Sequence, residues 1–161
     1  MRTRVYLETT IPSFYFTLRT DPESVARMSW TRRWWAECSR TFKLVTSPAV
    51  IGELRRGTHP AVRHRIELLK GVELLDVTEE VEEIAQIYIA RLVMPKDPAG
   101  DALHLAITSF HRVDVLLTWN CRHLANPNKM EHIRSINYEL GLPMPTLTTP
   151  VNYLSGDETD E

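Results

Sequence analysis

Short apolar runs rich in β-branched residues alternate along this chain with longer stretches in which apolar residues recur every three or four positions. The short runs are typical of buried strands, and the longer stretches are typical of helices with one apolar face. Their alternation predicts an α/β protein with three layers, in which helices cover both faces of a parallel sheet. We expect four or five strands, over residues 4–7, 42–46, 72–77 and 114–118, with 146–148 as the fifth.

Start and stop residues mark the helices between these strands. Ser47-Pro48 is typical of an N-cap followed by proline at the first helical position, and Gly57 ends the helix that follows. Asp97-Pro98 repeats this signal before a helix expected over residues 99–111. Further helices are expected over residues 22–39, 59–70 and 129–140, and from Thr78 to a stop at Pro95.

The composition indicates the number of domains and the charge of the folded part. Of 161 residues, 43% are apolar and 25% are charged, which is ordinary for a globular protein with one core. We expect a single domain over residues 1–154 and a disordered acidic tail over 155–161. The chain has 19 basic and 21 acidic residues, which become 19 and 17 without the tail. A domain so close to neutral is not expected to bind nucleic acid over its whole surface, although it can have a local basic groove.

The sequence contains no run typical of a membrane-spanning helix or a signal peptide, and no cysteine motif. No apolar run approaches the roughly 20 residues of a membrane-spanning helix. The first residues contain no apolar signal core, so we expect a cytoplasmic protein. The two cysteines, Cys38 and Cys121, have no metal-binding or redox spacing and are interpreted as ordinary thiols.

Four oxygen-bearing side chains fall where ligands bind in a doubly wound sheet. Glu8 follows the first expected strand, and Asn120 follows the fourth. Glu53 lies in the helix after the second strand, and Asp101 lies early in the helix that leads into the fourth. Because parallel strands end at one edge of the sheet, we expect these side chains to converge there.

Converging carboxylates without matched cations repel one another, and a hard divalent cation relieves that repulsion. Mg²⁺ or Mn²⁺ is therefore the expected ion, held by Glu8, Glu53 and Asp101, as in phosphodiester hydrolysis. Each residue also has a structural interpretation. The alternative for Glu53 is an exposed carboxylate on a helix surface, and the alternative for Asp101 is an acid that complements the helix dipole. Glu8 is harder to explain structurally, because a charge directly after an apolar strand is disfavoured.

Four segments, which span most of the chain, resemble the PIN-domain family, and within it the VapC-like toxins. They are VYLETTIPSFY at residues 5–15, SPAVIGELRRG at 47–57, GDALHLAI at 100–107 and VLLTWNCRHLAN at 115–126. The resemblance implies the PIN-like α/β/α fold and Mg²⁺- or Mn²⁺-dependent cleavage of single-stranded RNA. It also implies an antitoxin partner and a homodimer.

By the same resemblance, Glu8 stands where the family has its first-strand aspartate, Glu53 is the helix glutamate, and Asp101 is the third acid. Asn120 occupies the fourth acidic position, so the site has three formal negative charges. A second metal is then expected to bind more weakly. The expected chemistry is attack on an RNA phosphate by a water acidified at the metal, which leaves 5′-phosphate and 3′-hydroxyl ends.

Supporting roles are less specific, and each has a structural alternative. Thr9 and Thr10 are expected to orient water or a carboxylate, and the alternative is turn capping. Arg55 and Arg56 are expected to contact RNA phosphates, and the alternative is a solvated helix face. Arg122, next to His123, is also expected to contact an RNA phosphate, and the alternative is a structural turn.

Two other groups are assigned to the structure rather than to chemistry. His104 is interpreted as a hydrogen-bonded core histidine and not as a catalytic base. An aromatic cluster is assigned to the core or to a dimer contact, with base stacking as the alternative. Its members are Phe14, Tyr15, Trp30, Trp34 and Trp35.

Three other functions compete with a toxin ribonuclease. One is an RNA-processing nuclease without an antitoxin. Another is a catalytically weak or inactive PIN-like module that binds RNA or protein, which Glu8 and Asn120 in place of aspartates keep open. A flavodoxin-like switch protein is a distant third, because no phosphoacceptor aspartate and lysine can be placed at its active edge.

Overall fold

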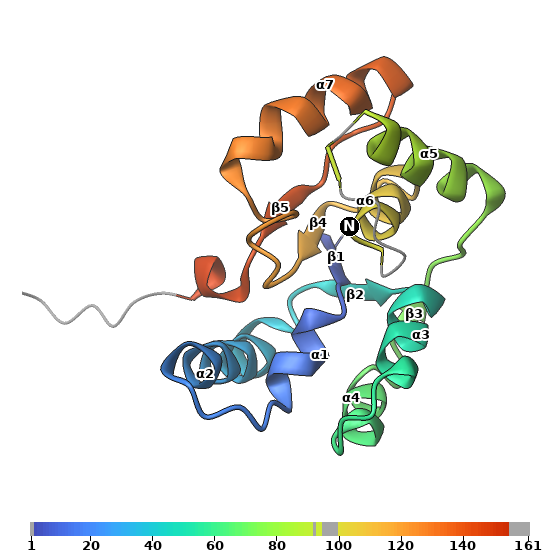
Figure 1. Cartoon of the computed structure of the whole chain (residues 1–161). Helices are drawn as coiled ribbons and strands as arrows, with labels where there is room; N and C mark the ends of the chain where they lie inside the picture. Colours follow the sequence, from blue (N-terminus) through green and yellow to red (C-terminus); the bar gives the residue numbers. More distant parts are fainter. Residues whose placement is uncertain (1, 92, 95–99, 155–161) are drawn as a thin grey trace, which may run out of the picture.

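The computed structural model describes residues 2–91, 93–94 and 100–154. Its strands are β1 (Arg4–Leu7), β2 (Lys43–Thr46), β3 (Glu73–Leu74), β4 (Val115–Leu117) and β5 (Thr146–Thr148). They form one parallel sheet in the order β3-β2-β1-β4-β5 (Figure 1). The expected parallel sheet of four or five strands is confirmed.

Helices cover both faces of this sheet. They are α1 (Thr10–Tyr15), α2 (Pro22–Cys38), α3 (Pro48–Arg56), α4 (Val62–Leu68), α5 (Glu79–Ala90), α6 (Asp101–Phe110) and α7 (Met130–Leu140), with short 3₁₀ turns η1 (Pro127–Lys129) and η2 (Pro150–Tyr153). Figure 1 shows α1 to α4 on one face and α5 to α7 on the other. The chain moves outward from β1 to β3 and then returns through β4 to β5. Right-handed crossovers in opposite directions place their helices on opposite faces.

Local residue chemistry explains most element bounds. Pro48 opens α3 and Gly57 follows its end, as predicted. Thr78 caps α5 by accepting a hydrogen bond from the Val81 backbone nitrogen at 3.3 Å. The predicted starts at Asp97-Pro98 and the stop at Pro95 lie outside the described residues.

Several elements differ from the prediction. Helix α1 was not expected, because six residues are too few to display a helical period. Helix α4 covers only Val62–Leu68, and β3 is an exposed two-residue edge strand rather than 72–77. The predicted start of the second strand at Phe42 was one residue early, since Phe42 stacks on Trp34 instead.

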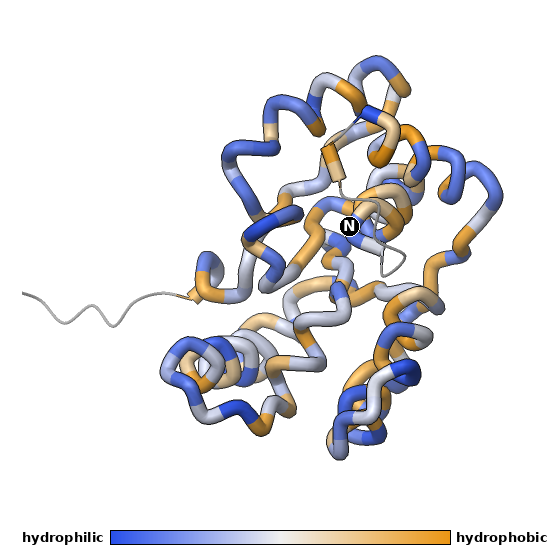
Figure 2. The backbone as a smooth tube through the Cα atoms, viewed as in Figure 1, coloured by the Kyte–Doolittle hydropathy of each residue, from blue (hydrophilic) through white to orange (hydrophobic). Residues whose placement is uncertain are grey.

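The core lies where the central strands meet α6. All of Val5–Leu7 and seven of the ten residues of α6 are buried. Figure 2 shows hydrophobic residues in the central strands and mixed hydropathy along the outer helices. Within the aromatic cluster, Trp34 is fully buried and so confirms a core role, whereas Trp30 is 38% exposed. No helix in the described part of the chain is long and apolar enough to cross a membrane.

Candidate active site

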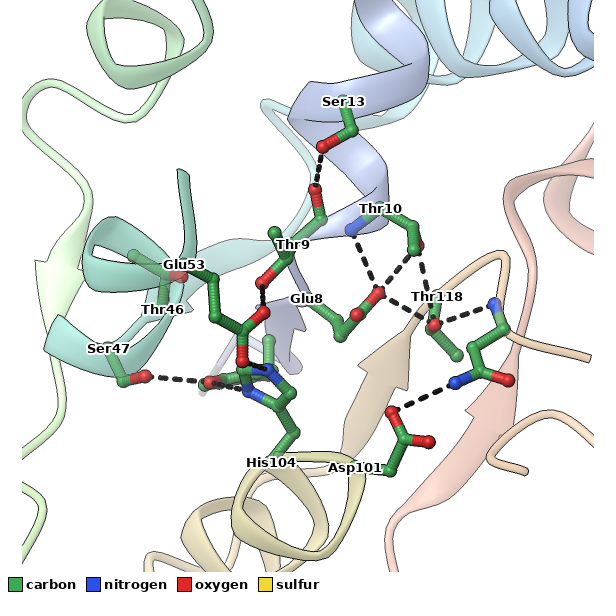
Figure 3. A network of polar contacts seen from close by, with 12 residues as sticks. Glu8, Thr9, Thr10, Ser13, Thr46, Ser47, Glu53, Asp101, His104 and Thr118 are labelled. Carbon is green, nitrogen blue, oxygen red and sulfur yellow. Dashed lines mark hydrogen bonds and ion pairs between the residues drawn. The ribbon is translucent and has the colours of Figure 1, made fainter. Parts of the chain in front are cut away.

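The candidate site lies where the order of the strands reverses, between β1 and β4. In parallel α/β sheets, ligands bind beyond the carboxyl ends of the strands at such a point. Glu8 directly follows β1, and Thr118 directly follows β4. Figure 3 shows Glu8, Glu53 and Asp101 approaching this place from three different elements. The predicted convergence of the carboxylates at one edge is therefore present.

Glu8 is only 4% exposed, and one of its oxygens is firmly held. Its Oε2 accepts hydrogen bonds from the Thr10 backbone nitrogen at 2.9 Å, from Thr10 Oγ1 at 2.5 Å and from Thr118 Oγ1 at 2.8 Å. The other oxygen has no donor among the described residues. Burial raises the pKa of the Glu8 carboxyl, and this effect exceeds the opposing influence of His104 and of the hydrogen bonds. A nearby cation would therefore stabilise the charged form.

Glu53 projects from α3 and is held at both oxygens. Its Oε2 accepts from Thr9 Oγ1 at 2.5 Å, and its Oε1 accepts from His104 Nε2 at 2.9 Å. One ligand atom from each of Glu8, Glu53 and His104 lies within 4.8 Å of the other two. These three side chains come from the residue after β1, from α3 and from α6, and they form the compact centre of the site.

His104 is connected to the core as well as to the site. Its Nδ1 lies 2.7 Å from the Tyr6 hydroxyl, which lies 2.8 Å from Ser47 Oγ. Because the Glu53 carboxylate can only accept, Nε2 carries a hydrogen, and both ring nitrogens are then engaged. The predicted N-cap Ser47 has the extended backbone of a cap. Its hydroxyl, however, forms a hydrogen bond with the Tyr6 hydroxyl and none with the start of the helix.

The expectation of a buried, hydrogen-bonded His104 holds, since the side chain is 1% exposed. Sequence reasoning missed that its partner is Glu53. Burial lowers the pKa of His104, but the Glu53 hydrogen bond and the charges of Glu53, Glu8 and Asp101 together outweigh it, so the pKa is raised. Its spacing of three residues from Asp101 was the available signal, because such residues share a helix face.

Asp101 and Asn120 form the outer side of the site. Asp101 is the first residue of α6 and is half-buried. Its Oδ1 accepts from Asn120 Nδ2 at 2.9 Å, and Asn120 Oδ1 accepts from the His123 backbone nitrogen at 3.0 Å. Asn120 therefore contacts Asp101 through nitrogen, while its oxygen closes a turn. Asp101 is not a member of the 4.8 Å group, and its Oδ2 has no donor among the described residues.

Gly100 brings α6 and α3 together. Its φ of +98° is a left-handed conformation that favours glycine. A Cβ at this position would lie 3.1 Å from Glu53 Oε1 and 3.4 Å from Leu103 Cβ. The glycine therefore permits both the turn into Asp101 and the close approach of Glu53.

The basic residues lie less centrally than the carboxylates. Arg55 and Arg56 are exposed at the end of α3, and neither has a hydrogen bond or ion pair from its side chain in the described part of the chain. Arg122 is exposed after β4. Lys129 was missed by sequence reasoning. Its Nζ lies 2.9 Å from the Val93 carbonyl oxygen, and burial lowers its pKa although the charge of Asp101 opposes this.

The donor set fits a hard divalent cation. Within the described residues, no lysine or arginine forms an ion pair with Glu8, Glu53 or Asp101, and the only partner of this kind is His104. Clustered carboxylates without a cation are unfavourable, and oxygen ligands are those that Mg²⁺ and Mn²⁺ prefer. Glu8 and Asp101 each keep one oxygen without a hydrogen-bond donor from the described residues.

The fold and the site together define a PIN-like α/β/α protein with an acidic centre at its switch point. A search of solved structures finds VapC20 of Mycobacterium tuberculosis, described as a Sarcin-Ricin loop cleaving toxin. That chain is 22% identical, with a TM-score of 0.53 over 70% of this chain and 86% of its own. The likeness establishes the fold predicted from the resemblance. No protein-family model and no curated protein matches the sequence.

Proposed function

We propose that this chain is a metal-dependent endoribonuclease that hydrolyses phosphodiester bonds of single-stranded RNA, and that it is the toxin of a toxin–antitoxin pair. The observation that carries the proposal is the convergence of Glu8, Glu53 and Asp101 at the switch point of a PIN-like sheet without lysine or arginine partners among the described residues. A purely structural cluster of this kind would be destabilising, because the carboxylates repel one another.

Mg²⁺ or Mn²⁺ is the proposed cofactor, and Glu8, Glu53 and Asp101 are the residues that would hold it. When bound, such an ion polarises a phosphate and acidifies a water. The chain's own contribution is to present the three carboxylates in fixed positions. The half-exposed Asp101 leaves that edge of the site open to a polymer substrate.

Each carboxylate has its own orienting partner in this proposal. Thr10 fixes Glu8, and Asn120 fixes Asp101. His104 and Thr9 fix Glu53 from opposite oxygens. Partners of this kind set the direction and basicity of metal ligands. His104 is accordingly a positioning residue, because both of its nitrogens are already engaged.

The toxin assignment draws support from the likeness to VapC20, which is described as a Sarcin-Ricin loop cleaving toxin. The antitoxin, the homodimer and the phosphate contacts of Arg55, Arg56 and Arg122 remain predictions.

The decisive experiment is cleavage of mixed single-stranded RNA, and of the Sarcin-Ricin loop, by purified protein with Mg²⁺, Mn²⁺ or EDTA. Asp101→Asn keeps the size of the side chain and removes its charge. We expect metal-dependent cleavage that falls about 100-fold or more in the variant, since losing even a supporting residue of a metal site costs about 10- to 100-fold.

Glu80→Gln is the matched control, because Glu80 is an exposed acid in the first turn of α5. It removes the same charge and should cleave like the wild type. If the folded wild type cuts no RNA with either metal, the nuclease proposal is wrong and the chain is instead a binding module.

A further inference from the structure

A pocket of about 200 Å³ lies beside α1, outside the carboxylate centre. It is lined by Ser13, Phe14, Thr17, Arg19 and Arg65. The residues come from α1, from the segment that follows it and from α4. The lining contains two guanidinium groups, two hydroxyl groups and one aromatic ring, but no carboxylate. Its chemistry is therefore opposite to that of the acidic centre.

Arg65 places a positive charge in this pocket at a cost. Its Nη2 donates to the Ser13 carbonyl oxygen at 3.0 Å and lies 3.5 Å from that of Phe16. Its Nε is buried without a hydrogen-bond partner in the described part of the molecule. No carboxylate pairs with this side chain there, and burial lowers its pKa. A partly desolvated cation without a counterion is unfavourable, and an anion in the pocket would offset this.

The other polar groups also leave donors available. Arg19 is exposed, and within the described residues its guanidinium forms no hydrogen bond or ion pair. Thr17 Oγ1 accepts from the Arg19 backbone nitrogen at 3.2 Å, so its own hydrogen remains to be donated. Two arginines and a hydroxyl form a donor set suited to a phosphate, which guanidinium groups bind through paired hydrogen bonds.

Helix α1 connects this pocket with the carboxylate centre. Thr10 at its start binds Glu8, and Ser13 Oγ donates to the Thr9 carbonyl oxygen at 2.8 Å (Figure 3). At a rise of about 1.5 Å per residue, Ser13 and Phe14 lie about 5 and 6 Å along the helix from Thr10, and Thr17 follows the end of the helix. Figure 1 shows α1 leading away from the sheet between α2 and α4.

We propose that this pocket binds a backbone phosphate of the RNA strand, close to the phosphodiester that lies at the carboxylate centre. The proposal rests on the proposed function. Arg19 and Arg65 hold the phosphate, Thr17 donates to it, and the Phe14 ring forms a flat wall beside the adjoining nucleotide. The pocket thereby gives the strand its direction across the site. An acidic peptide offers similar charges, but α1 places the pocket along the path that leads to the nuclease centre.

The test is binding of a labelled single-stranded RNA to the full chain in EDTA, measured by fluorescence anisotropy over a series of salt concentrations. Each lost phosphate contact to a single strand should reduce the salt slope of the binding constant by about 0.7. We expect Arg19→Ala to bind about 3- to 10-fold more weakly and to lose about that slope. Arg65→Lys should weaken binding with the slope kept, because the charge remains while the planar fork is lost.

Arg40→Ala is the matched control, since Arg40 is exposed ahead of the amino end of β2, at the opposite edge of the sheet. It should bind like the wild type, and thermal unfolding should be similar for Arg19→Ala and Arg40→Ala. Wild-type affinity and slope in both Arg19→Ala and Arg65→Lys would overturn the pocket assignment, as would absence of RNA binding by the wild type.

The two proposals can fail separately. Weakened RNA binding in Arg19→Ala, with no cleavage by the wild type, would support the pocket and reject the nuclease. Normal metal-dependent cleavage with unchanged binding in the variants would do the reverse. A glutamate-rich peptide that binds the wild type more tightly than RNA, and loses affinity in Arg19→Ala, would reassign the pocket to an acidic peptide.

Discussion

Two buried polar networks touch α6, and they differ in charge. His104 joins Tyr6, Ser47 and Glu53 on one side of the helix. Ser109, five residues later and so on another side, belongs to the second network.

In that second network, the Tyr88 hydroxyl donates to Asn137 Oδ1 at 2.5 Å and lies 3.1 Å from Ser109 Oγ. Asn137 Nδ2 donates to Ser109 Oγ at 3.0 Å and to the Pro143 carbonyl oxygen at 3.1 Å. This network is neutral and closed, and it ties α5, α6 and α7 together.

The difference separates two uses of buried polarity. A neutral network in which each group has a partner adds stability and specificity to packing. The network at Glu53 instead ends in a group of carboxylates, some of whose oxygens accept no hydrogen bond from a described residue. The first arrangement is suited to holding helices together, and the second is suited to binding. Substitutions in the two networks should therefore affect different measurements.

Glu53→Gln should give the largest effect in the charged network. The amide keeps the shape of the side chain but removes a charge from the proposed metal site. We expect cleavage to fall about 100-fold or more, while the free energy of unfolding in urea changes by less than about 1 kcal/mol because steric packing is retained. A loss of stability larger than the loss of activity would give Glu53 a structural role.

Asn137→Ala should give the opposite result in the neutral network. Asn137 is 1% exposed, and its loss leaves a carbonyl without a partner and leaves the Tyr88 hydroxyl with Ser109 alone. We expect the free energy of unfolding to fall by about 2 to 3 kcal/mol. The cleavage rate per folded molecule should stay unchanged. A specific loss of activity in the stable temperature range would contradict the separation of the two networks.

Tyr88 offers a pH test of the neutral network. Burial raises the pKa of Tyr88 to about 12, although its hydrogen bonds with Ser109 and Asn137 oppose this. The unfolded chain has a tyrosine pKa of about 10 and loses its proton first as the pH rises. Stability is therefore lost between about pH 10 and 12, by up to about 2 kcal/mol from this group. The stability difference between wild type and Tyr88→Phe in urea should narrow over this range. An unchanged difference would contradict the assignment.

Tyr6→Phe should give the smallest effect of the four. It removes the hydroxyl between Ser47 and His104 and leaves Nδ1 of the ring without its partner. We expect cleavage and Mn²⁺ affinity to fall together, about 3- to 10-fold, because Glu53 is held less firmly. Tyr138→Phe is the control, since Tyr138 is 84% exposed. Equal activity of Tyr6→Phe and wild type would remove Tyr6 from the positioning chain.

Much of the fold was accessible from the sequence because its signals are local. Strands 4–7 and 146–148 were placed at their observed bounds, as was α3 between Pro48 and Gly57. The strand ends and the early helix positions then directed Glu8, Glu53 and Asp101 to one edge. Helix α1 escaped prediction because it is short, and Phe42 was included in a strand because its packing against Trp34 has no local signal.

The hydrogen-bond partners were not accessible in this way. That Ser47 binds Tyr6 instead of its own helix depends on residues 41 positions apart. The contact between His104 and Glu53 spans 51 positions, and that between Arg65 and Ser13 spans 52. Side-chain type and spacing along the chain do not determine such contacts, since they depend on the packing of α1, α3, α4 and α6 around the sheet.

Gly100 shows how a position without a side chain can be as constrained as a catalytic one. Any Cβ there would meet both a disfavoured backbone conformation and the Glu53 carboxylate. If the chain is the toxic nuclease proposed above, substitutions at position 100 should be enriched beside those of the three acids in a saturation-mutagenesis selection for cells that survive its expression. Glu8, Glu53 and Asp101 would tolerate few replacements for the sake of their charge, whereas position 100 would tolerate few for the sake of its emptiness.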